Sequence, residues 1–361
     1  MKVFFDWLKR HFNDPQVIIL FVLLILGTVV ILTLGKILTP LLASVIIAYL
    51  LDGIVERLRR WRIPRFIAVL IVFLSFMAAL LFLLFGLMPK ISYQIGQVVA
   101  DLPAMVARGQ SQLMHLPERY PDFISQDQIT RLTRYFQTEV ARWGQHALSY
   151  SIASVRGIVT FLVYLLLVPL MVFFFLKDKQ KIFKWAQRFM PPNNELSDRV
   201  WRQVDRQTGK YIRGKFWETL IIWGSSYVVF SLIDLQYAML MGFIVGISVL
   251  VPYVGVVVVT FPVALAGYFQ WGISSELLTL LIAYGVIQLI DGNLLAPLLF
   301  SEVVDLHPVA IIAAVLVFGG IWGFWGVFFA IPLATLIEAV LSVLPNLQHN
   351  QQEQDENHAE T

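Results

Sequence analysis

The stretch "FIAVLIVFLSFMAALLFLLFGLMP" (residues 66–89) contains no charged side chain over 24 residues. A run of about 18 or more apolar residues is long enough to cross the hydrocarbon core of a bilayer, which is about 30 Å thick. Four more long uncharged runs occur at residues 17–35, 157–176, 237–275 and 309–337. Shorter runs at 37–51, 219–233 and 277–290 can cross if flanking residues or protein shield their ends. The sequence therefore predicts an all-α, polytopic helical membrane protein with about eight membrane segments.

The composition agrees with this prediction. Hydrophobic residues make up 58% of the 361 positions and charged residues 14%, whereas soluble domains average about 45–50% apolar and about 25% charged residues. A soluble helical core could not bury so many long uncharged runs. The run at 17–35 is longer than the apolar core of a signal peptide and no small-x-small cleavage site precedes Lys36, so we expect it to remain as an anchor. The chain has no cysteine, which excludes disulfides and thiolate ligands.

The charges are distributed unevenly along the chain. All 27 Lys and Arg lie at or before Lys215, so residues 1–215 carry a net charge of +14 and residues 216–361 a net charge of −11. The basic residues gather before Pro15, at 57–65 and at 177–215. The positive-inside rule places these three regions, and hence the N-terminus, in the cytoplasm.

Composition and pattern divide the chain into six regions. Three crossings from a cytoplasmic N-terminus place residues 90–151 on the outer side of the membrane. Apolar residues at helical spacing in this region predict amphipathic helices that cap the membrane domain or contact a neighbouring subunit. The basic stretch is typical of helices lying on an anionic inner leaflet, so a nucleic-acid partner is not expected. The predicted regions are 1–89 (three spans), 90–151 (periplasmic helices), 152–176 (fourth span), 177–216 (cytoplasmic interfacial helices), 217–345 (C-terminal membrane domain) and 346–361 (disordered acidic tail).

One segment has the spacing of a nucleotide-binding motif but lacks its essential residues. "GKYIRGKF" (residues 209–216) has the spacing of a phosphate-binding loop, but Phe216 stands where a Mg²⁺-binding Ser or Thr is needed and no strand precedes the segment. No metalloprotease or nucleophile-elbow motif occurs either. We therefore expect no enzymatic activity and no cofactor, and any transport by this chain should be driven by a gradient.

The C-terminal half has signals for broken or re-entrant helices. Residues 237–275 as one helix would be roughly 58 Å long, about twice the hydrocarbon thickness, so the chain must turn back. Pro252 and Gly255 in "VPYVG" (251–255) favour the turn there, at the surface or at membrane depth. Gly242 and Gly246 have the spacing of a close helix contact. Residues 309–337 form either one tilted helix with a glycine seam or a helical hairpin.

Polar residues interrupt the apolar pattern in "LIDGNLLAPLLFSEVVDLHP" (289–308). If residues 277–300 enter the membrane, Asp291 lies part-way along the helix, where Gly292 and Pro297 weaken it. An ionisable group at that depth costs several kcal/mol unless it faces protein or water, and so indicates a pathway. We expect unwound backbone here, with no Lys or Arg nearby, and a path for a cation, a proton or a polar uncharged solute. The expected pathway residues are Asp291, Asn293, Glu302, Asp305 and His307.

Two other interpretations of this stretch remain open. It could be a polar loop outside the bilayer, with Asp291 as an interfacial cap. Two carboxylates and a histidine could also bind a metal ion, but the spacing matches no standard metal site, so none is expected.

Several stretches resemble a known family of bacterial inner-membrane proteins, the AI-2 exporter (AI-2E) family, and within it the PerM-type permeases. These stretches are "VPYVG" (251–255), "DGNLLAPLLFSEVVDLHP" (291–308), "FGGIWGFWGVFFAIPLATLI" (318–337), "YLLLVPLMVFFFLKDK" (164–179) and "YIRGK" (211–215). The resemblance covers nearly the whole chain. Positions distinctive of the family correspond here to Pro252, Gly255, Asp291, Pro297, His307, Pro308, Gly320, Gly323 and Pro332. Together with Gly292, the prolines and glycines of this set are the expected helix breaks or hinges.

The resemblance implies a multi-pass permease of about eight segments in the lipid bilayer of the inner membrane, assembled as a homo-oligomer such as a pentamer. Members of the family are associated with export of the signal molecule autoinducer-2, and some with Na⁺(Li⁺)/H⁺ antiport. The favoured function is thus a secondary transporter of a small polar solute, such as autoinducer-2 or a related metabolite. The alternatives are a cation/proton antiporter and a non-transporting scaffold or assembly factor that docks partners on its outer helices and inner basic face.

Overall fold

The computed structural model describes residues 15–114, 154–187, 195–300 and 307–338, with a few isolated positions between 127 and 142. Almost all of these residues are helical, and no strand occurs among them. Five helical segments are long and apolar enough to cross a membrane: Leu38–Arg60, Arg65–Met105, Thr160–Trp185, Val254–Trp271 and Ser275–Phe300. The prediction of a polytopic helical membrane protein is confirmed.

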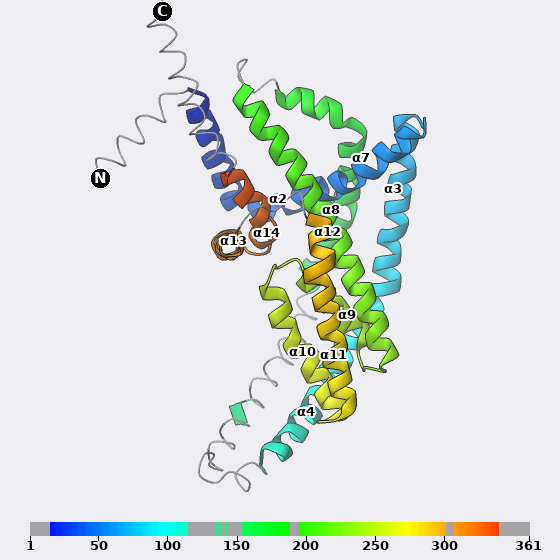
Figure 1. The fold of residues 1–361 in the computed structure, drawn as a ribbon. Helices are drawn as coiled ribbons and strands as arrows, with labels where there is room; N and C mark the ends of the chain where they lie inside the picture. The colour runs from blue at the N-terminus through cyan, green and yellow to red at the C-terminus, as the bar shows by residue number, and fades with distance from the viewer. Residues whose placement is uncertain are drawn as a thin grey trace, which may run out of the picture.

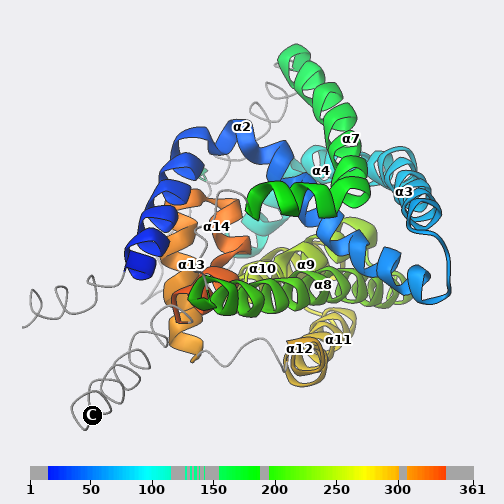
Figure 2. The same ribbon diagram turned by 90° about the horizontal axis from the view of Figure 1, so that it is seen from above.

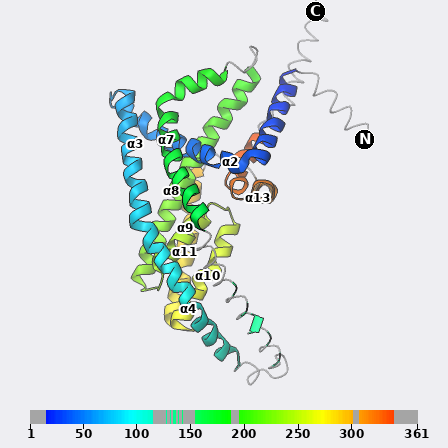
Figure 3. The ribbon, with the colours of Figure 1, turned by 180° about the vertical axis from the view of Figure 1, so that it is seen from behind.

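Of the first three helices, α2 crosses the bundle, and α3 and α4 together form one long rod. Helix α2 (Pro15–Arg60) contains Pro40, and the part of α2 after Pro40 runs across the top of the bundle to reach α3 (Figures 1 and 2). Helix α3 (Arg65–Phe82) continues through a π-helical turn, η1 (Leu83–Leu87), into α4 (Met88–Met114). Figure 3 shows α3 and α4 as one rod. The predicted boundary at residue 89 therefore falls inside continuous helix, and half of the predicted outer region 90–151 lies outside the described residues.

Two long helices follow, α7 (Ser154–Gln187) and α8 (Glu195–Leu232). Helix α7 bends at Asp178, whose backbone angles (φ −104°, ψ 17°) are not helical, close to the predicted boundary at residue 176. Helix α8 runs through residue 216 without a break. The predicted basic interfacial segment and the membrane segment after it are thus parts of one helix.

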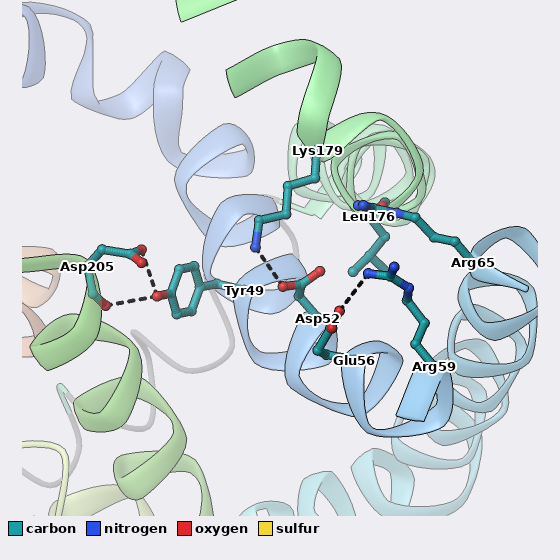
Figure 4. A network of polar contacts seen from close by, with 8 residues as sticks. All are labelled: Tyr49, Asp52, Glu56, Arg59, Arg65, Leu176, Lys179 and Asp205. Carbon is teal, nitrogen blue, oxygen red and sulfur yellow. Dashed lines mark hydrogen bonds and ion pairs between the residues drawn. The ribbon is translucent and has the colours of Figure 1, made fainter. Parts of the chain in front are cut away.

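Polar contacts fasten α2 to both of these helices (Figure 4). The hydroxyl of Tyr49 donates to Asp205 of α8, 2.7 Å from Oδ1 and 2.8 Å from the backbone oxygen. The ammonium group of Lys179 in α7 lies 2.7 Å from the carboxylate of Asp52. Beneath these contacts, α2, α3 and α7 share an apolar cluster of Ala48, Leu51, Val55, Ala68, Val69, Val72, Val172 and Leu176. The crossing part of α2 is therefore held on both sides.

The predicted turn within residues 237–275 is confirmed. Helix α9 (Ala238–Ser248) ends before it and α10 (Val254–Trp271) begins after it. Helix α9 packs closely on α8, because a Cβ atom at Gly246 would lie 2.5 Å from the Cβ of Trp223 and one at Gly242 2.9 Å from the backbone nitrogen of Tyr227. The close contact expected from this glycine pair is present.

The last membrane elements are a continuous helix and a hairpin. Helix α11 (Ser275–Ile290), the π-helical turn η2 (Asp291–Leu295) and α12 (Ala296–Phe300) follow one another without interruption. Helix α13 (Pro308–Trp322) is seen end-on in Figure 1, so its axis lies across that of the α11–α12 helix. At Gly323 (φ +60°) the chain turns into α14 (Phe324–Phe328), and residues 330–334 pack back on α13. Of the two interpretations of residues 309–337, the hairpin is the one observed.

Candidate functional site

A cavity of about 700 Å³ lies where α8, the α9–α10 turn, the α11–α12 helix and α13 meet. Its walls are mostly apolar and aromatic. Its charged and amide-bearing lining residues are Lys215, Glu218, Gln288 and Asp291, and Tyr211 and Tyr253 also line it. A concave, largely apolar space with a few converging polar groups is the usual form of a small-molecule site.

Asp291 is the predicted pathway residue that lines this cavity. It is the first residue of the π-helical turn and only 7% of its surface is exposed. Its Oδ1 atom is buried and has no hydrogen-bond partner among the described residues. One helical turn earlier, the amide nitrogen and oxygen of Gln288 are also buried and have no hydrogen-bond partner among the described residues. Unsatisfied buried polar groups are costly, so a molecule or ion held in the cavity would gain by bonding to them.

The backbone around Asp291 is helical, and the expected unwinding was wrong. Instead of unwinding, the helix widens into a π-helical turn over Asp291–Leu295. The backbone N–H of Ala296 donates to the carbonyl of Asp291 in this turn. Such a turn accommodates Pro297, which has no N–H to donate, while the other backbone groups stay bonded inside the membrane. Turns of this type occur often at functional sites, because they re-aim a side chain within a helix.

Facing Asp291 is a buried ion pair on α8. The ammonium group of Lys215 lies 2.6 Å from Oε2 of Glu218 and donates to the carbonyl of Val249 at 2.8 Å. It also lies 5.0 Å from the centre of the Phe300 ring. The two paired side chains are 7% and 4% exposed. Lys215 is thus fixed by contacts with α8, the α9–α10 turn and α12.

The structure corrects the expectation that no basic residue lies near Asp291. Lys215 and Asp291 line the same cavity, although 76 positions separate them in sequence. With all three groups ionised, one ammonium group faces two carboxylates, which leaves one excess negative charge. Because an uncompensated charge in a poorly solvated interior is costly, the site favours a cation, a proton or hydrogen-bond donors of a neutral solute over an anion.

Two other predicted pathway residues, Asn293 and His307, are described by the structure and do not line the cavity. Asn293 is exposed and donates to the Leu289 carbonyl of its own helix at 2.9 Å. His307 is exposed and caps α13, its Nδ1 accepting from the Val309 N–H at 3.3 Å. Glu302 and Asp305 lie outside the described residues. Of the three predicted residues that the structure describes, only Asp291 lines the cavity.

The predicted hinge residues fall into three groups. Pro252, Gly292 and Pro297 line the cavity. Gly255 sits where α10 begins, and a Cβ atom there would be 1.8 Å from the Ser248 carbonyl oxygen. The rest belong to the hairpin: Pro308 in the first turn of α13, Gly320 within it, Gly323 at its end and Pro332 in the helical stretch 330–338.

Lys215, Glu218 and Gln288 were not predicted from the sequence. One signal was present, since Lys215 is the last basic residue of the chain and Glu218 follows it at i+3, just before an uncharged run, a spacing that allows an ion pair on one helix face. Gly214 allows α12 to pack closely against α8, because a Cβ atom at this position would be 2.5 Å from the Phe300 ring. No group of three or more metal-ligating side chains occurs in the part of the chain that the structure describes.

Comparison with known proteins gives a consistent result. A family model described as "AI-2E family transporter" matches residues 18–346. The chain is 40% identical to "Putative permease PerM" of Escherichia coli strain K12, over 96% of this chain and 99% of that protein. It is 23% identical to "AI-2 transport protein TqsA" of the same strain, over 89% of this chain and 91% of that protein.

Proposed function

Because the chain belongs to the AI-2E family of transporters, we propose that it is a gradient-driven secondary transporter of a small polar solute and that the solute passes through the cavity beside Asp291. Transporter sites are commonly built near the membrane midplane, where helices are interrupted and polar groups face a protected space. The α11–α12 helix is not interrupted at Asp291, but it has an irregular π-helical turn there and a carboxylate on the cavity wall.

The observation that carries this proposal is the set of unsatisfied polar atoms on the wall. Asp291 Oδ1 and both polar atoms of the Gln288 amide are buried without a partner among the described residues. They lie in a helix that is otherwise long and apolar enough to cross the membrane. A solute with hydroxyl groups that reached these atoms would supply the hydrogen bonds that they lack.

The solute that fits best is autoinducer-2 or a related small polar metabolite. Support comes from the family and from the relative whose name states AI-2 transport. The cavity adds a chemical argument, because its carboxylates and amide offer acceptors to a hydroxyl-rich, uncharged molecule while its aromatic walls exclude bulk water.

Na⁺(Li⁺)/H⁺ antiport is the second candidate function. It is supported by the excess of one carboxylate over ammonium groups at Lys215, Glu218 and Asp291. A monovalent cation or a proton would neutralise that excess. An imposed proton gradient that drives uptake of ²²Na⁺ into vesicles, without any organic solute, would favour this candidate over solute export.

The topology and assembly belong to the same proposal. We place the protein in the bacterial inner membrane with its N-terminus in the cytoplasm, because the basic clusters then face inward. A homo-oligomer, with five subunits as the family resemblance implies, is proposed on that resemblance alone.

Asp291→Asn is expected to lower transport in liposomes roughly tenfold to a hundredfold, because a hydrogen bond to a charged group contributes about 1.5–3 kcal/mol. The measurement is autoinducer-2 or ²²Na⁺ flux under an imposed gradient. Asn293→Ala is the matched control, since Asn293 lies on the same helix and bonds only to its own backbone. Equal flux through Asp291→Asn and the parent protein would refute the pathway. If the folded parent protein shows no flux for any solute tested, the alternative function, a non-transporting scaffold or assembly factor, would be favoured.

A further inference from the structure

A second cavity lies between α2, α3 and α8 and shares Lys215 with the candidate site. It is an apolar groove of about 750 Å³, roofed by the crossing part of α2 and walled by α3 and α8. Three of its lining residues, Ile54, Ile71 and Phe216, are each more than 40% exposed, so the groove is open at its side. Its one charged lining residue among those described, Lys215, directs its ammonium group to Glu218 and the Val249 carbonyl.

The dimensions of the groove match one leaflet of a bilayer. Its lining residues on α3 run from Ile71 to Leu83 along one helix face, which is about 18 Å at 1.5 Å per residue. Half of the hydrocarbon core of a bilayer is about 15 Å thick. The groove starts near the α2–α3 turn and follows α3 toward the membrane interior, so it has the length and the polarity of a lipid acyl chain.

Unpaired basic residues lie in the last turn of α2 and in the α2–α3 turn, next in sequence to the groove-lining residue Leu58. Arg57, Arg60 and Arg62 are exposed and form no ion pair with any residue that the structure describes. Arg59, by contrast, is 3.0 Å from Glu56, as Figure 4 shows. Trp61, 74% exposed, lies among the arginines, a common position for tryptophan at a membrane interface.

The turn also has a strained backbone. Arg62 has φ +64°, a left-handed conformation that favours glycine and is unfavourable for a residue with a side chain. Its N–H donates to the carbonyl of Arg59 at 2.9 Å, which closes the end of α2. An arginine at a position where glycine would be easier is consistent with a requirement for its positive charge.

We propose that this groove and the three arginines form a binding site for an anionic phospholipid of the cytoplasmic leaflet, with one acyl chain in the groove and the headgroup phosphate against Arg57, Arg60 and Arg62. The apolar walls take the chain and the guanidinium groups take the phosphate, for which their planar donors are well suited. The polar contacts of Tyr49 and Asp52 hold the α2 roof in place. The site does not depend on which solute the protein transports.

The test is native mass spectrometry of the full chain in detergent, titrated with phosphatidylglycerol and with phosphatidylcholine of the same chain length. The parent protein is expected to bind the first phosphatidylglycerol at least tenfold more tightly. The triple variant Arg57→Gln/Arg60→Gln/Arg62→Gln should lose this preference, since each basic residue near an anionic surface contributes roughly fivefold in affinity. Ala79→Trp, which fills the groove at an exposed position of α3, should weaken binding of both lipids.

Two matched controls make the result decisive. Lys177→Gln/Lys181→Gln/Lys184→Gln removes three exposed charges from α7, and Ala78→Trp adds the same bulk at the exposed neighbour of Ala79 outside the groove. Both controls should bind lipid as the parent protein does. The proposal is overturned if the arginine and lysine triples reduce the phosphatidylglycerol preference equally, or if the two tryptophan variants behave alike, because binding would then be diffuse.

Discussion

Replacing Lys215 with methionine is expected to destabilise the membrane domain by about 3–5 kcal/mol, the usual cost of removing one partner of a buried ion pair. Glu218 and Asp291 would then face each other's charge without the ammonium group that lies 2.6 Å from Glu218. The change also removes the hydrogen bond to the Val249 carbonyl. Unfolding in mixed micelles of a mild detergent and dodecyl sulfate, followed by circular dichroism, would measure it.

A second substitution separates loss of pairing from loss of packing. The double variant Lys215→Met/Glu218→Leu replaces both charges with apolar groups of similar size, which often restores most of the stability of a buried pair. We expect it to be more stable than Lys215→Met alone, with a favourable coupling in the double-mutant cycle. If Lys215→Met is as stable as the parent protein, the pair is hydrated and the description of the cavity as poorly solvated is wrong.

Gly255→Ala is the other substitution with a large expected effect. The added Cβ atom would lie 1.8 Å from the Ser248 carbonyl oxygen, and a backbone atom cannot move aside as a flexible side chain can. We expect a loss of about 3 kcal/mol or more, at or above the upper end of typical overpacking, because α9 and α10 must separate at the turn beside the cavity. The same unfolding assay measures the effect.

Gly285→Ala is the control for this prediction. Gly285 lies in the interior of α11 and a Cβ atom there would meet nothing within 4 Å. Alanine is favoured over glycine in a helix interior by up to about 1 kcal/mol, so this variant should be as stable as the parent protein or more so. Equal stability of Gly255→Ala and Gly285→Ala would contradict the close approach of α10 to the end of α9.

The broad architecture follows from the sequence because the bilayer restricts what a chain can do. Backbone groups in hydrocarbon must be bonded within their own segment, so a long uncharged run such as 66–89 predicts a helix without tertiary information. The turn at Pro252 was predictable for a similar reason, since residues 237–275 are too long for one crossing. The break at Gly323 was left open, because four glycines in nine positions permit either a seam or a turn.

The candidate site was only half predictable. Asp291 stood out because a carboxylate in an apolar run is costly anywhere in the membrane. Lys215 did not, since it ends a basic stretch that orientation rules assign to the cytoplasmic surface. The length of α8, which runs from Glu195 to Leu232 without a break, carries Lys215 into the protein, and helix contacts across 76 positions of sequence then bring it to Asp291. Such contacts have no local signature.

The helical continuity at Asp291 has a comparable cause. Glycine and proline around it indicate a weak helix, and the sequence alone gives no reason to choose a π-helical turn over unwound backbone. The choice depends on packing, because the turn keeps α12 against α8 at the close contact of Gly214 with Phe300.

Reaction of single cysteines with a charged, membrane-impermeant thiosulfonate tests the central claim most directly, that Asp291 lines a cavity that polar molecules enter from one side of the membrane. The chain has no native cysteine, and the reagent needs a hydrated thiolate. We expect Asp291→Cys to be modified from one side of the membrane and Leu298→Cys, on the same helix but 74% exposed away from the cavity, to stay unmodified in lipid. A folded protein in which Asp291→Cys does not react, or in which both cysteines react at the same rate, would contradict the account.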